Sequence, residues 1–226
     1  MHAEGKVAKS ATSRKQHLAV LAACLAVSLA GGCKVMSLEE DQALRARANK
    51  SIDASTYVSE IWDARALPEM KSKAVPLDEL TAAVARDLDQ AGSRFGRRVG
   101  EGSAWTFVVE GRGTVTQVNA ASPRGIVRLA LPGSGASARE AELQIGPVVT
   151  GTAVRDALPF VSFNDFSDQL AFADLGRALT QRALLGVRPE VQRLADGRQI
   201  AFIGVINLRE PGDPLVITPV SMGAAS

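Results

Sequence analysis

The sequence predicts an α+β domain in which N-terminal helices pack on an antiparallel β-sheet. Apolar residues recur at helical spacing in residues 53–92, alternate as in strands from Trp105 onward, and end in a hairpin over residues 199–220. Helices followed by a run of strands are typical of α+β folds. Because glycines interrupt these strands, the sheet can also close as a small barrel that resembles an OB-fold.

The first 32 residues have the pattern of a bacterial secretion leader. Basic residues precede a run of uncharged residues at 18–30, which is too short for a transmembrane helix of roughly 20 residues. The run ends in Leu29-Ala30-Gly31-Gly32-Cys33, the pattern of a lipobox, whose cysteine is acylated before cleavage. We therefore predict a signal peptide at 1–32, a lipid anchor and tether at 33–52, and lipidation at Cys33.

Two alternatives to this leader remain open. Cys24 also follows a box-like pattern, but cleavage there would leave only about six apolar residues after Lys15. The other alternative is an uncleaved helix that lies in the core or along the membrane. Lys34 after the cysteine favours the outer membrane over the inner one, although the leaflet is not fixed by the sequence.

The predicted mature chain lacks the residues of most common active sites. Both histidines and one of the two cysteines precede Cys33, and the remaining 22 basic and 23 acidic residues give a net charge of −1. These features exclude Ser-His-Asp and Cys-His catalysis, nitrogen- or sulfur-ligated zinc and a basic nucleic-acid surface. We expect no cofactor, no metal and no catalytic residue.

Two amphipathic helices are predicted before the strands. Asp53 or Ser55 caps the first, and Pro68 ends or kinks it. Pro76 precedes the second, which stops near Gly92. Trp62 is expected in the core.

Strands follow, with one late helix among them. Gly111 and Gly113 are expected to break the first strand, and Asp174 to cap the helix. The strands are predicted at residues 105–109, 115–118, 125–131, 140–149, 199–208 and 215–220. Residues 53–226 are thus predicted to form a single α+β domain.

The segment 146–166, GPVVTGTAVRDALPFVSFNDF, mixes polar and aromatic residues. One interpretation is a pocket for a sugar or polyol, in which aromatic faces meet C–H groups while carboxylates and amides bind hydroxyls. The other is a structural turn held by an ion pair. The candidate binding residues are Trp105, Arg155, Asp156, Asn164 and Asp165.

The chain resembles a family of predicted periplasmic lipoproteins called domain of unknown function 2291. The resemblance rests on Gly32-Cys33-Lys34-Val35, Tyr57 to Trp62 with Leu67-Pro68, Phe95-Gly96-Arg97-Arg98 to Trp105-Phe107, Gln144-Ile145-Gly146-Pro147, Gly151 to Phe166, and Ile217-Thr218-Pro219-Val220. It implies a lipid-anchored periplasmic protein often encoded beside sugar-type ABC transporters, and it implies no catalytic residue.

Three functions are compatible with these features. The first is a non-enzymatic accessory of solute uptake that binds a sugar or polyol, or sugar-type ABC transporter components. The second is a carboxylate-based glycan hydrolase that uses Asp156 with Asp165, or Asp165 with Asp168, since such enzymes need two carboxyl groups about 5–9.5 Å apart. The third is a purely structural envelope lipoprotein.

Overall fold

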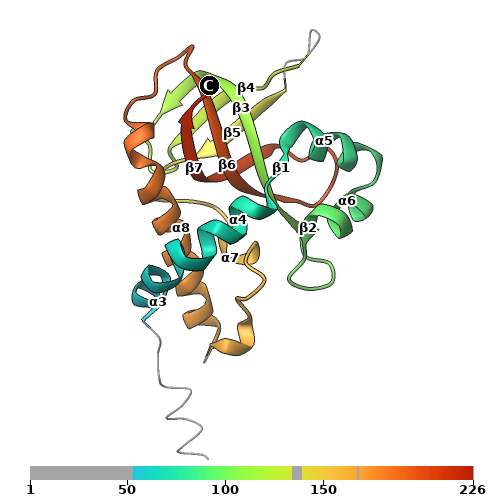
Figure 1. Ribbon diagram of the computed structural model, residues 1–226, viewed down its shortest axis with the longest axis vertical. Coiled ribbons are helices and arrows are strands. Elements are labelled where there is room, and N and C mark those ends of the chain that lie inside the picture. The colour runs from blue at the N-terminus through green and yellow to red at the C-terminus, as the bar shows by residue number, and fades with distance from the viewer. Residues whose placement is uncertain (1–52, 134–138, 167, 226) are drawn as a thin grey trace, which may run out of the picture. The chain divides into compact units, whose positions relative to one another are not determined.

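The computed structural model describes residues 53–133, 139–166 and 168–225. The predicted signal peptide, the tether and Cys33 lie outside these residues. In the described part, seven strands form one sheet and helices pack around it (Figure 1). The predicted α+β class is confirmed. None of the described helices is both long enough and apolar enough to cross a membrane.

The first predicted helix is longer than expected. Helix α3 (Ala54–Ile61) begins at Asp53, whose carboxylate accepts the N–H of Thr56 at 2.9 Å. It continues through a π-helical turn, η1 (Trp62–Ala66), into α4 (Leu67–Lys73). Pro68 therefore lies in the first turn of α4 and does not end the helix, because a proline there lacks only an N–H that has no partner within α4. Trp62 is buried, as predicted.

The second predicted helix is two helices. Between α5 (Leu77–Arg86) and α6 (Leu88–Phe95), Asp87 takes an extended conformation and its carboxylate caps α6 by accepting the N–H of Gln90. The short strands β1 (Val75–Pro76) and β2 (Gly96–Arg97) flank the two helices and pair with β3.

The five long strands pair in a closed ring. They are β3 (Trp105–Asn119), β4 (Ile126–Ala130), β5 (Glu140–Gln144), β6 (Gln199–Leu208) and β7 (Leu215–Ala224). Their order is β3-β4-β5-β7-β6, and β6 pairs back to β3. The sheet is mixed, not wholly antiparallel as predicted, because β5–β7 and β1–β3 are parallel. A ring of five strands cannot alternate direction throughout, so one pairing in it has to be parallel.

Strand β3 does not break at its glycines. Gly111 lies against the ring of Phe202, where an added Cβ would be 2.8 Å from Cζ. At Gly113 an added Cβ would be 3.1 Å from both the Ala130 carbonyl oxygen and the Leu129 Cβ. Both glycines stay paired with β6. They allow close approach of neighbouring groups and do not end the strand.

Two hydrophobic clusters hold the described domain together. One fills the ring and includes residues of α5 and α6, among them Leu80, Phe107, Leu129, Leu143 and Ile206. The other lies between the outer face of β3, β6 and β7 and the remaining helices, and includes Trp62, Val108, Leu158, Leu179 and Val205. The buried members of both clusters lie within residues 58–220 of the described chain.

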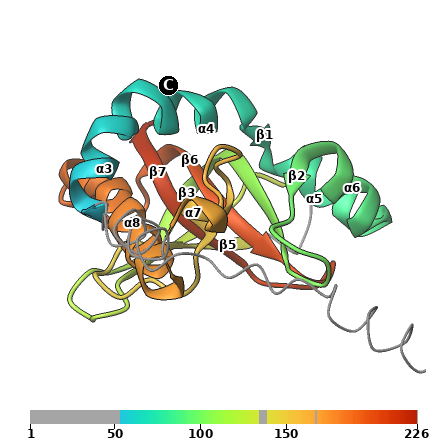
Figure 2. The ribbon, with the colours of Figure 1, turned by 90° about the horizontal axis from the view of Figure 1, so that it is seen from below.

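The helices on the outer face come from two parts of the chain. The helix α7 (Ala153–Asp156), the 3₁₀ turn η2 (Phe163–Asp165) and α8 (Gln169–Val191) connect β5 to β6. Helix α8 packs beside α3 (Figure 2). It begins at an Asp168 cap, six residues before the predicted Asp174 cap, because the Asp168 carboxylate accepts the N–H of Ala171 at 2.8 Å.

Candidate functional site

A groove of about 830 Å³ lies between the start of α5 and the strands β3, β6 and β7. Its volume is within the range of about 300–1,000 Å³ that small-molecule sites occupy. The groove is not predictable from the sequence, because its residues come from segments far apart in the chain. They are Pro76–Asp78, Thr81, Glu110–Arg112, Leu131–Gly133, Arg139, Ala201–Ile203 and Ser221–Gly223.

The register of the strands forms the apolar floor of this groove. Gly111, Phe202 and Met222 are neighbours across β3, β6 and β7. Since Gly111 has no side chain, the Phe202 ring fills the place where a Cβ would otherwise lie. Leu77 and Leu131 add apolar surface beside it.

The rim of the groove carries two charges of each sign. Asp78 and Glu110 are acidic, Arg112 and Arg139 are basic, and all four side chains are exposed. A balanced rim over an apolar floor suits a neutral ligand that has both C–H surface and several hydrogen-bonding groups. A strongly charged ligand would meet like charges as well as opposite ones.

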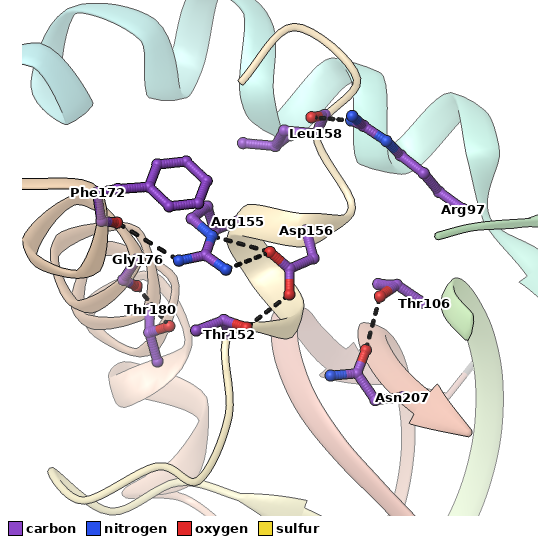
Figure 3. Close-up of polar contacts among 10 residues, drawn as sticks. All are labelled: Arg97, Thr106, Thr152, Arg155, Asp156, Leu158, Phe172, Gly176, Thr180 and Asn207. Carbon is purple, nitrogen blue, oxygen red and sulfur yellow. Dashed lines mark hydrogen bonds and ion pairs between the residues drawn. The ribbon is translucent and has the colours of Figure 1, made fainter. Parts of the chain in front are cut away.

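Arg155 and Asp156, two of the predicted binding residues, form an ion pair on α7. Arg155 Nη2 lies 2.7 Å from Asp156 Oδ1, and the two side chains are only 12% and 11% exposed. The Thr152 hydroxyl donates to the same carboxylate, and the guanidinium lies over the Phe172 ring, 3.9 Å from its centroid (Figure 3). This arrangement ties α7 to α8, which is the structural interpretation of the motif.

The predicted residues Asn164 and Asp165 lie in η2, where both are exposed. The Asp165 carboxylate accepts the N–H of Ser162 at 3.1 Å, and the Ser162 hydroxyl accepts the N–H of Asn164. The two residues thus take part in a local cap. The glycan-hydrolase hypothesis named the carboxylates of Asp156, Asp165 and Asp168. Each of them accepts a hydrogen bond from a residue three or four positions away in the chain.

Trp105, the remaining predicted residue, lies on β3 against α6. Its indole N–H donates to Asp89 at 2.8 Å, and Arg98 stacks on its ring 4.1 Å from the centroid. Gly92 makes room for the ring, because an added Cβ there would be 2.2 Å from it. The structure therefore brings Arg155 and Asp156 together, places Trp105 elsewhere, and puts none of the five predicted residues in the groove.

The pKa of Asp89 is lowered below its usual value of 3.8. The hydrogen bond from Trp105 is the largest cause, and the hydrogen bond and positive charge of Arg98 add to it. Because the folded-state pKa is the lower one, this carboxylate stabilises the fold above about pH 4, and that contribution is lost as the pH falls further. We expect Trp105 fluorescence to change below pH 4. In Asp89→Asn that titration should be absent, and its persistence would contradict the assignment.

The ring of five strands, with a helix between its third and fourth members, defines an OB-fold protein. A crystal structure of an OB-fold protein from Thermotoga maritima is similar to this chain, with a TM-score of 0.62 and 16% sequence identity. The match covers 77% of this chain and 99% of that one. At this identity, the similarity establishes the fold alone.

The chain belongs to the family of predicted periplasmic lipoproteins called domain of unknown function 2291, which matches residues 22–223. This places the protein in the cell envelope with a lipid anchor. No curated protein matches the chain.

The surface that OB-folds commonly use for ligands is not aromatic here. In many OB-folds the second and third strands and the adjacent loops bind oligonucleotides or oligosaccharides. The corresponding strands β4 and β5 read IVRLA and EAELQ, without an aromatic residue on which a base or sugar can stack. Arg128 and Glu142 pair across them at 3.1 Å. The groove beside α5 is therefore the stronger candidate site.

Proposed function

We propose that this protein is a non-enzymatic, lipid-anchored accessory of solute uptake that binds a sugar or polyol in the groove beside α5. Sugar-type ABC transporter components are its proposed protein partners. The observation that carries the proposal is the groove itself, which combines about 830 Å³ of space, an apolar floor and a charge-balanced rim. Sugars and polyols have this pairing of C–H surface with many hydroxyl groups.

A glycan hydrolase is the second candidate, and one observation supports it. The groove contains two carboxylates, Asp78 on α5 and Glu110 on β3. Hydrolysis of a glycosidic bond needs one such group as acid and another as base or nucleophile. If the protein is a hydrolase, Asp78→Asn and Glu110→Gln should abolish turnover while a ligand still binds.

Thermal unfolding of residues 34–226 against a panel of pentoses, hexoses and polyols tests the binding proposal. A ligand at about 100 times its Kd stabilises the folded state by roughly 2.7 kcal/mol. For a domain of this size, that raises Tm by about 5–10 °C. A shift with one sugar or polyol supports the proposal, and no shift across the panel contradicts solute binding.

Two arginine variants test where the ligand binds. Arg139 lies on the rim of the groove, whereas Arg124 is another exposed arginine, in the β3–β4 loop. We expect Arg139→Ala to reduce the ligand-induced Tm shift and Arg124→Ala to preserve it. The opposite result would place the ligand on the usual OB-fold surface, where that loop contributes.

A further inference from the structure

We infer that the ligand of the groove is a sugar of two linked units, and that its second unit occupies a smaller hollow further along α5. The inference rests on the proposed function and deepens it, because it gives the size of the sugar and a position for each unit. The smaller space is called the second hollow.

The second hollow lies between α5 and the turn that joins β6 to β7, which passes beside α5 (Figure 1). Its volume is about 260 Å³, and it is lined by Val84 and Ala85 of α5 and by Pro211 and Pro214 of the turn. On its own this volume is below the range of about 300–1,000 Å³ that small-molecule sites occupy. It is therefore suited to part of a ligand and not to a whole one.

Two residues, Thr81 and Arg139, line both the groove and the second hollow. Along α5, Asp78 lines the groove alone, whereas Ala85 lines the second hollow alone. Residues three and four positions apart share one face of a helix, so positions 78, 81 and 85 follow one line along α5. From Thr81 to Ala85 the helix rises by about 6 Å, which is comparable with the width of one sugar ring. Two linked rings can thus lie on either side of Thr81.

The junction between the two spaces offers one hydrogen-bond acceptor and several donors. The Thr81 hydroxyl donates to the Asp78 carbonyl oxygen at 3.0 Å, so toward a ligand the same hydroxyl oxygen accepts. The Arg139 guanidinium can only donate. The hydroxyl and ether oxygens around a glycosidic bond include both donors and acceptors, so the place where two sugar units join is suited to this junction.

The second hollow repeats the ligand chemistry of the groove. Val84 and Leu208 give it buried apolar surface, and Glu140 and Asp213 are its acidic residues. The Asp213 carboxylate is held in place because it accepts the N–H of Glu210 at 3.0 Å. Apolar surface beside hydrogen-bond acceptors suits a second unit with C–H groups and hydroxyls, as the first unit has.

Calorimetric titration of the mature acylated chain tests the inference. The protein is kept in a polyoxyethylene detergent, because glycosidic detergents are themselves sugars. Each disaccharide is compared with its own units: maltose, cellobiose and trehalose with glucose, lactose with galactose and glucose, and xylobiose with xylose. We expect at least one disaccharide to bind about tenfold more tightly than its units, which corresponds to about 1.4 kcal/mol.

Two alanines of α5 provide matched variants. Ala82 and Ala85 are both exposed, but Ala85 lines the second hollow and Ala82 lines neither space. In Ala85→Trp the indole fills the second hollow, so the disaccharide should lose its tenfold advantage over the monosaccharide. In Ala82→Trp the advantage should remain. Thermal unfolding without ligand checks that both variants are folded.

The possible results separate the inference from the proposed function. If a sugar raises Tm in the solute panel but no disaccharide binds more tightly than its units, the inference is wrong and the proposed function stands. A tenfold advantage that persists in Ala85→Trp, or is lost equally in Ala82→Trp, also overturns the inference, because the second unit then lies elsewhere. If no sugar of either size binds, both are wrong.

Discussion

Replacing Arg155 with alanine is expected to lower the free energy of unfolding by about 3–5 kcal/mol, which is the usual cost of removing one partner of a buried ion pair. Asp156 would remain at 11% side-chain exposure without its cation. The guanidinium also packs on Phe172 and reaches its carbonyl oxygen, so the link between α7 and α8 is lost with it.

Thermal or urea unfolding measures this loss, which for a domain of this size corresponds to a fall in Tm of about 10 °C. Arg177→Ala is the matched control. Arg177 also forms an ion pair with an aspartate, Asp174 within α8, but both of those side chains are largely exposed. Exposed pairs contribute at most about 1 kcal/mol. Equal losses in the two variants would contradict the structural role of Arg155.

The same variant distinguishes the two interpretations of the 146–166 segment. If Arg155 bound solute directly, Arg155→Lys would keep the charge and lose mainly ligand affinity. If Arg155 holds α7 to α8, Arg155→Lys loses the bidentate contact and the stacking on Phe172, and stability falls even without ligand. We expect the second result.

Features of local sequence were predictable from the chain. Apolar periodicity gave the α+β class and the closing hairpin, because helical and strand spacing differ over a few residues. The cap at Asp53 and the burial of Trp62 follow from the same local rules, and both are present in the structure. The interpretation of Arg155 and Asp156 as a structural turn also required only their adjacency.

The groove was not predictable because it depends on register between distant strands. Gly111 and Phe202 are 91 positions apart in the chain, and only the pairing of β3 with β6 brings them together. Local signals were also wrong where tertiary contacts decide the conformation. Gly111 and Gly113 indicated a break, but packing against Phe202 and Ala130 keeps β3 continuous.

Replacing Gly146 with alanine is expected to destabilise the domain by about 3 kcal/mol, near the upper end of the usual cost of overpacking. Gly146 follows β5 and lies against the β3–β4 loop. An added Cβ would be 2.5 Å from both the Arg124 carbonyl carbon and the Gly125 nitrogen, and 2.6 Å from the Pro123 oxygen. The loop is also joined to this point by the N–H groups of Ile145 and Gly146, which donate to the Gly125 oxygen.

The large effect follows from the kind of atom that the new methyl group would meet. At Gly111 an added Cβ meets only the Phe202 side chain, which can rotate, but at Gly146 the three nearest atoms are all backbone. Relief therefore requires the loop to move and its hydrogen bonds to lengthen. Urea unfolding measures the loss, and Gly212→Ala is the control, because nothing lies within 4 Å of a Cβ there. If both variants unfold at the wild-type urea concentration, β5 and the β3–β4 loop do not approach this closely.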